Sequence, residues 1–90
     1  MKHILALALL CLLPATALAW DGFDADTTAL VEVTPAEMPK AGQTIEIRDY
    51  DTDETNGYTV ESVKRNVRTV EISVRNTATN SKRVVVMEGL

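Results

Sequence analysis

Apolar and polar residues alternate along most of the chain after residue 27. Ile45 and Ile47 flank Glu46, and the same period of two recurs from Val70 to Val74. Such a period is typical of β-strands that bury one face and expose the other. It predicts five strands, which we place at Thr28–Val33, Thr44–Asp49, Tyr58–Lys64, Thr69–Arg75 and Arg83–Glu88.

The segments between these strands have the composition of loops and turns. Residues 34–42 contain Pro35 and Pro39, which cannot donate a hydrogen bond to a sheet. Residues 51–57 and 76–81 are rich in Asp, Thr, Asn and Ser, as hairpin turns are. Short strands joined mostly by hairpins predict an all-β fold. We expect a small five-stranded antiparallel barrel, SH3-like or OB-like, with a two-layer sandwich as the alternative.

The last strand contains four apolar residues in a row and therefore breaks the alternation. Because neighbouring side chains leave a strand on opposite faces, we expect Val84 and Val86 to point into the barrel. Val85 and Met87 would then point outward. Either another segment covers this outward pair, or the pair forms a surface for a partner or for a second copy of the chain.

The beginning of the chain has a different pattern. Ile4–Leu13 is an unbroken apolar run after a short basic start, and it is too short to span a bilayer. Pro14 follows it, and Ala17-Leu18-Ala19 offers the small side chains that a signal peptidase accepts. We therefore expect a signal peptide at residues 1–19, a single β-barrel domain at residues 20–90, a periplasmic or secreted location and no stable membrane anchor.

Removing the signal peptide changes the chemistry that is available. The only cysteine, Cys11, and the only histidine, His3, lie within it, as does Lys2. The remainder has 9 − 1 = 8 basic and 13 acidic residues, a net charge of −5. This charge argues against nucleic acid and anionic lipid as partners. Without Cys or His, the mature chain has no zinc finger, disulfide, thiol nucleophile or histidine-based triad.

An acidic turn is the clearest candidate for a ligand site. Alternate carboxylates on a turn, here Asp49, Asp51 and Asp53, can converge on a hard cation such as calcium. The other interpretation is a solvated hairpin turn. A calcium-binding structural domain that uses residues 49–54 is therefore the alternative function.

Aromatic and basic residues supply two further candidate surfaces. Trp20 and Phe23 either stack on a ligand or cover an end of the barrel, and with Val85 and Met87 they form the expected binding surface. The basic side chains are expected to pair with the acidic turns, with capture of an anionic ligand as the alternative. They are Lys64, Arg65, Arg68, Arg75, Lys82 and Arg83.

Catalysis is not expected. Glu46, Glu61 and Glu71 alternate with the apolar positions, so they should face solvent rather than a cleft. A domain of this size also has little room for a cleft that withholds a carboxyl group from water. We expect a non-enzymatic module with a binding or structural role, whose partner is an unknown envelope protein or a glycan. We expect it to need no cofactor, with calcium as the one candidate, and to be a monomer or a weak homodimer.

The segment Trp20-Asp21-Gly22-Phe23-Asp24 resembles the mature start of a family of small exported bacterial proteins of unknown function, which begin Trp-Asp-Gly-aromatic-Asp. The similarity continues through Gly42, residues 45–47, residues 49–52 and Tyr58, and it covers nearly all of Trp20 to Met87. The chain departs from that pattern at residues 74–77, which replace a second acidic turn. The resemblance implies secretion and a compact β domain, and it brings no established activity.

Overall fold

The computed structural model of this chain describes residues 19–89. Apart from Ala19, the predicted signal peptide lies outside the described residues. The described part contains six strands: β1 Trp20–Asp24, β2 Leu30–Thr34, β3 Thr44–Asp49, β4 Glu54–Arg65, β5 Thr69–Asn76 and β6 Lys82–Glu88. In residues 19–89 there is no helix long and apolar enough to cross a membrane.

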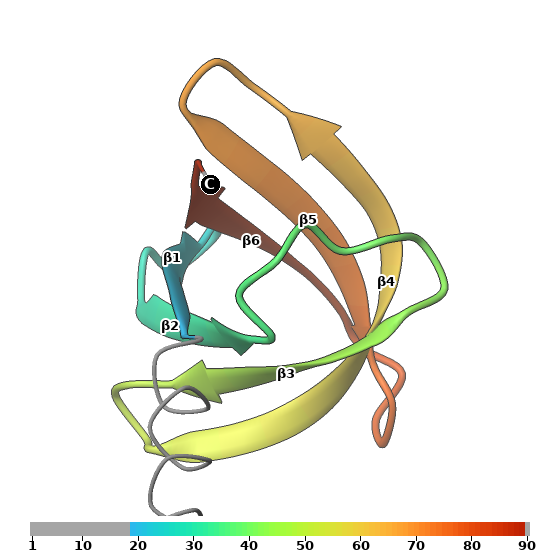
Figure 1. The fold of residues 1–90 in the computed structure, drawn as a ribbon. Helices are drawn as coiled ribbons and strands as arrows, with labels where there is room; N and C mark the ends of the chain where they lie inside the picture. Colours follow the sequence, from blue (N-terminus) through green and yellow to red (C-terminus); the bar gives the residue numbers. More distant parts are fainter. Residues whose placement is uncertain (1–18, 90) are drawn as a thin grey trace, which may run out of the picture.

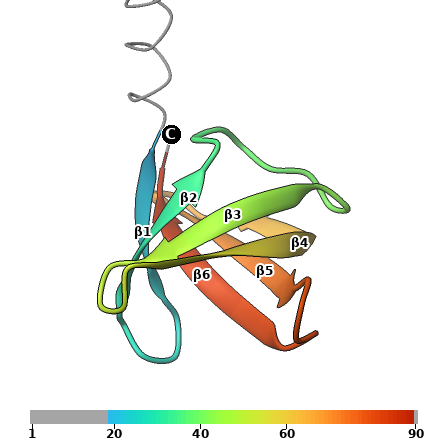
Figure 2. The ribbon, with the colours of Figure 1, turned by 90° about the horizontal axis from the view of Figure 1, so that it is seen from below.

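The strands form a closed antiparallel barrel in which each strand lies beside its neighbours in the sequence. Figures 1 and 2 show the sheet curling until β6 lies beside β1. The expected all-β antiparallel barrel is confirmed, but the expected number of five strands is wrong. The additional strand is β1, so this up-and-down order of six replaces the SH3-like or OB-like arrangement of five.

Strand β1 closes the barrel. Its residues 20–23 pair with β2, whereas only Gly22, Phe23 and Asp24 pair with β6. Beyond that short ladder, the Nε1–H of Trp20 donates a hydrogen bond of 2.8 Å to the backbone carbonyl of Glu88. The Trp20 side chain thus joins β1 to β6 where their backbones no longer pair.

Gly22 lets β1 and β6 approach closely. A Cβ atom at this position would collide with the Sδ atom of Met87 and with the backbone carbonyl of Val86. Since one of those atoms belongs to the backbone of the neighbouring strand, a larger residue would force the two strands apart. The close approach of β6 therefore explains why position 22 of the segment 20–24 is a glycine.

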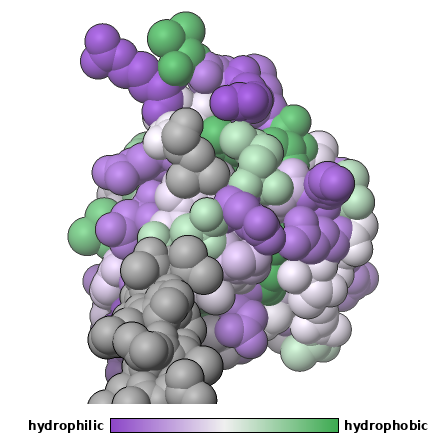
Figure 3. Space-filling model, viewed as in Figure 1, coloured by the Kyte–Doolittle hydropathy of each residue, from purple (hydrophilic) through white to green (hydrophobic). Residues whose placement is uncertain are grey.

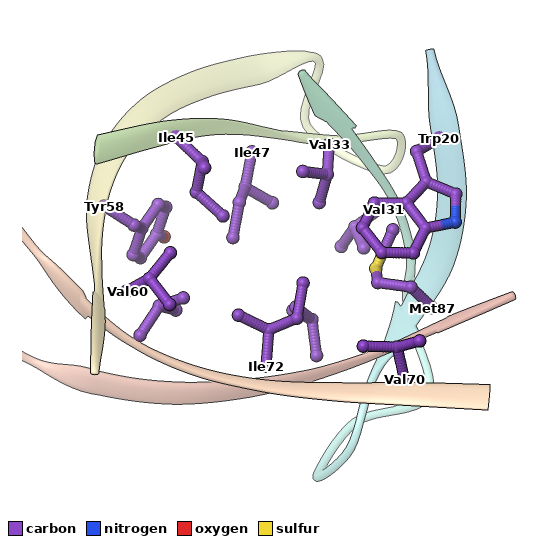
Figure 4. Close-up of a cluster of buried hydrophobic side chains, with 12 residues drawn as sticks. Trp20, Val31, Val33, Ile45, Ile47, Tyr58, Val60, Val70, Ile72 and Met87 are labelled. Atoms are coloured by element: carbon purple, nitrogen blue, oxygen red, sulfur yellow. The ribbon is translucent and has the colours of Figure 1, made fainter. Parts of the chain in front are cut away.

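The inward side chains of all six strands form one apolar core. Figure 4 shows Trp20 and Tyr58 at opposite ends of this row of side chains. The buried apolar residues are Trp20, Val31, Val33, Ile45, Ile47, Tyr58, Val60, Val70, Ile72, Val74, Val85 and Met87. The expected alternation in β3 and β5 is confirmed, because Ile45, Ile47 and the set Val70, Ile72 and Val74 are all buried.

The expected orientation of the last strand is wrong. Val85 and Met87 are fully buried, whereas Val84 and Val86 point outward. The reason lies at Arg83, which has the same inward parity as Val85 and Met87 because it pairs with the inward-facing Val74. The core accepts this arginine because it forms ion pairs with the carboxylates of Asp24 and Asp49 at the end of the barrel.

Strand β4 bends so that it pairs with both of its neighbours. Residues Glu54–Thr59 pair with β3, and residues Tyr58–Arg65 pair with β5. The register shifts between Val60 and Ser62, which marks a bulge at Glu61. Such a bulge increases the local twist of a strand, as closure of so small a barrel requires.

Candidate functional site

One end of the barrel is closed by a cluster of polar side chains from four strands. The guanidinium group of Arg83 lies 2.6 Å from a carboxylate oxygen of Asp24 on β1. The same group contacts both carboxylate oxygens of Asp49 on β3, and it donates to the hydroxyl oxygen of Tyr58 on β4 at 3.1 Å. We call these four residues the Arg83 cluster.

The charges of this cluster are fixed by their neighbours. Burial by itself would raise the pKa of the Asp24 carboxyl group, but hydrogen bonds from Arg83 and from the backbone N–H groups of Thr27 and Asp26 hold it below its ordinary value. Burial disfavours the Arg83 cation, yet its bonds to Asp49, Asp24 and Tyr58 outweigh burial and raise its pKa. Among residues 19–89, no buried side-chain nitrogen or oxygen lacks a hydrogen-bond partner. The buried polar atoms of the cluster are therefore satisfied within the protein.

The carboxylates proposed for calcium do not converge. Asp49 faces the interior and binds Arg83, whereas Asp53 binds Arg48 at 2.8 Å. Asp51 is exposed at the tip of the turn. In the part of the chain that the structure describes, no three His, Cys, Asp or Glu side chains lie together as metal ligands. Two of the three aspartates are engaged by arginines, Asp53 by the nearby Arg48 on β3 and Asp49 by the sequence-distant Arg83 on β6.

A row of apolar side chains crosses the outside of the barrel. Leu30 on β2 pairs with Phe23 on β1, and Phe23 pairs in turn with Val86 on β6. All three point away from the core, and Leu30 is 61% exposed and Phe23 39% exposed. We call Leu30, Phe23 and Val86 the outer apolar row.

This row borders a hollow between β1, β2, β6 and the start of β5. The hollow has a volume of about 240 Å³ and is lined largely by apolar atoms of the outer apolar row. Asp21, Arg68 and Glu88 supply its charged rim. A hollow of this volume has room for one aliphatic or aromatic side chain, and charged groups on its rim can orient what enters.

An acidic network lies next to the outer apolar row. The single hydroxyl proton of Tyr50 is shared between Asp21 Oδ1 at 2.9 Å and Glu32 Oε2 at 3.1 Å. The hydrogen bond to Asp21 and then partial burial and the bond to Glu32 raise the pKa of Tyr50 to about 12. The phenol bridges the two carboxylates, and Arg48, which lies 3.7 Å from Glu32 and 4.8 Å from the centre of the Tyr50 ring, offsets part of their charge.

A basic turn stands at the far end of β4 and β5. Val67 in this turn is 100% exposed, although turns of hairpins usually carry small or polar residues. Lys64, Arg65 and Arg68 surround it in the sequence. Figure 3 shows an apolar side chain (green) beside hydrophilic ones (purple) at the end where Figure 1 draws this turn. We call residues 64–68 the basic turn.

The structure separates the four residues that the sequence grouped as a binding surface. The side chains of Trp20, Val85 and Met87 belong to the core. Trp20 covers an end of the barrel, the second of the two roles expected for it, whereas the outward orientation expected for Val85 and Met87 is wrong because β6 has the opposite parity. Phe23 does lie on the outside.

Sequence analysis missed Leu30, Val86 and Val67 as surface residues. Leu30 and Val86 were assigned to predicted strands as ordinary apolar positions, and only their cross-strand pairing with Phe23 brings them together. The sequence did indicate that Val67 is unusual, since hairpin turns seldom place an apolar residue between basic ones.

The fold and its surface define a small up-and-down β-barrel with a saturated ionic cluster at one end and an apolar hollow outside its closing strand. Residues 20–90 match the family described as "Family of unknown function (DUF5334)", and the chain belongs to that family. Comparison with curated proteins and with solved structures finds no match.

Proposed function

We propose that this protein is an exported, non-enzymatic module of the periplasm or cell envelope that binds another protein through the hollow outside strand β1. Export is supported by the basic start, the short apolar run and the small residues before Trp20. The family match begins at residue 20, directly after these features.

The observation that carries the binding role is the outer apolar row. Single exposed apolar residues are common on protein surfaces, but contiguous ones beside a hollow are typical of interaction sites. Leu30, Phe23 and Val86 are contiguous by strand register. They add nothing to the barrel core, whose members all come from the opposite faces of the same strands.

The chemistry of the hollow favours a protein segment as its occupant. Its lining of aliphatic groups and one aromatic ring suits an apolar side chain, and carboxylates of Asp21 and Glu88 on its rim suit neighbouring cations. The preferred segment therefore presents one apolar side chain among basic residues.

The absence of enzymatic activity is part of the proposal. A carboxyl group that donates a proton near neutral pH needs a raised pKa. The most deeply buried carboxyl group in the described residues, that of Asp24, has its pKa lowered by Arg83 and is fully hydrogen-bonded. It is suited to holding the barrel closed rather than to proton transfer.

Site-specific photocrosslinking in the native host tests this function. A photoreactive benzoylphenylalanine replaces Leu30, which borders the hollow, and a matched variant carries it at Thr44, an exposed residue on β3, which does not line the hollow. We expect protein adducts from position 30 and none from position 44. Equal adducts from both positions, or adducts that contain only glycan, would contradict a protein-binding hollow.

A further inference from the structure

Two features of the surface are chemically complementary. The hollow presents apolar walls and a charged rim on which two carboxylates, those of Asp21 and Glu88, outnumber one cation, Arg68. The basic turn presents Val67, fully exposed, between Arg65 and Arg68. Each feature is what the other would bind.

We propose that the basic turn of one copy of this protein occupies the hollow of a second copy, and that the second copy reciprocates, so that the protein forms a symmetric homodimer. This inference rests on the proposed function, because it takes the hollow to be a binding site and names its occupant. It differs from a dimer through Val85 and Met87, which the core excludes.

The basic turn fits the hollow in size and charge. A valine side chain fits a hollow of about 240 Å³ with room for neighbouring methylene groups of lysine or arginine stems. From residue 20 onward the chain has a net charge of −5, which makes most approaches of one copy to another repulsive. The basic turn is the part of the chain with three cations in five residues, so it is the approach that the acidic rim favours.

The position of the two features allows a reciprocal contact. Arg68 belongs to the basic turn and also lines the hollow, so the two features lie next to each other on one copy. A two-fold axis beside them would place each turn over the hollow of the other copy. In such a closed pair the basic turn and the hollow of each copy are both occupied. Neither is then free to bind a third copy, so the assembly ends at a dimer.

Sedimentation velocity of the exported protein over a concentration series tests the inference. We expect reversible dimers, and we expect Val67→Asp and Phe23→Ser each to weaken dimerisation at least about tenfold, because each removes apolar burial from both contacts. Ala78→Asp, a matched change in the exposed β5–β6 turn, should leave dimerisation unchanged. Thermal melting of each variant checks that it is folded, and Leu30→Ser replaces Phe23→Ser if the latter melts early.

Mixing the two impaired variants gives a sharper test. The Phe23→Ser copy keeps its turn and the Val67→Asp copy keeps its hollow, so a mixed pair retains one intact contact whereas each variant alone retains none. We therefore expect ¹⁵N-labelled Phe23→Ser to show shifts at residues 66–68 when unlabelled Val67→Asp is added. No shift in the mixture would overturn the inference.

Other outcomes separate the inference from the proposed function. A wild-type protein that stays monomeric up to about 1 mM, or a dimer that Val67→Asp does not weaken, overturns the homodimer. Adducts of position 30 with a different protein would then still support the hollow as a binding site. If position 30 gives no adducts and the protein is monomeric, both fail.

Discussion

Replacing Arg83 with alanine is expected to cost about 3–5 kcal/mol in the free energy of unfolding, because it leaves two carboxylates at the barrel end without their cation. The side chains of Arg83, Asp24 and Asp49 are only 16%, 10% and 21% exposed, so water replaces the lost partner poorly. A domain of 90 − 19 = 71 residues has about 4–11 kcal/mol of stability in total. Urea denaturation followed by circular dichroism should therefore find that Arg83→Ala loses a large part of the wild-type stability.

Arg75→Ala is the matched control for this prediction. Arg75 pairs with Glu61 at 2.9 Å on the outside of the barrel, where the two side chains are 34% and 36% exposed. Removing such a pair should cost at most about 1 kcal/mol. If Arg83→Ala proves no more destabilising than Arg75→Ala, the Arg83 cluster does not hold the barrel end closed.

Acid should reduce the difference between Arg83→Ala and the wild type. The folded protein lowers the pKa of Asp24, so the stability from this group is present above the unfolded value of about 3.9. It is lost as the pH falls below that value through the lowered pKa. Denaturation at pH 7 and near pH 3 should therefore give a larger penalty at pH 7, and a penalty that grows in acid would contradict this origin.

Trp20→Ala is the second substitution with a large expected effect, a loss of about 3–5 kcal/mol. The indole is 3% exposed, fills the barrel end opposite Tyr58, and bonds to the carbonyl of Glu88 at 2.8 Å. Trp20→Phe keeps most of the volume and removes the N–H donor, so it should cost about 1–2 kcal/mol. Urea denaturation followed by far-ultraviolet circular dichroism measures both, and a Trp20→Ala variant within about 1 kcal/mol of wild type would show that the indole does not close the barrel.

The parts of the fold that could be predicted are those in which alternation is uninterrupted. Strands β3 and β5 carry only isoleucine and valine at their inward positions before the last residue of each strand, and their orientation was predicted correctly. Strand β1 has Trp20, Gly22 and Asp24 at its inward positions, and neither glycine nor aspartate reads as a core residue. The inward position 22 is a glycine because β6 leaves no room for a side chain there. Asp24 can occupy an inward position because the guanidinium group of Arg83 neutralises its carboxylate.

The orientation of β6 could not be predicted for the same reason. Three consecutive valines do not indicate which of them face the core, so the orientation has to be inferred from the flanking residues. An arginine at position 83 is expected to face solvent, and this would turn Val84 and Val86 inward. Only the carboxylates of Asp24 and Asp49, which lie 59 and 34 positions away from Arg83 in the sequence, reverse that argument. Long-range ion pairing of this kind leaves no trace in a local pattern.

Of the three residues in the outer apolar row, only one could be predicted from the sequence to lie on the surface. Phe23 was recognised as an aromatic residue outside the predicted strands, whereas Leu30 and Val86 looked like core positions. Their outward orientation follows from the register of β1 with β2 and β6, which the sequence does not display. The hollow beside them lies where the β1–β6 pairing ends, at Gly22 and Met87.

The inward face of β1 closes the barrel, and we propose that its outward face binds a partner. The most direct test is the free energy of unfolding of Phe23→Ser, measured by urea denaturation of dilute protein beside Trp20→Ala. We predict that Phe23→Ser stays within about 0.5 kcal/mol of wild type, as surface substitutions do. A loss as large as that of Trp20→Ala would contradict the account, because Phe23 would then serve the fold and the outer apolar row would not be free for a partner.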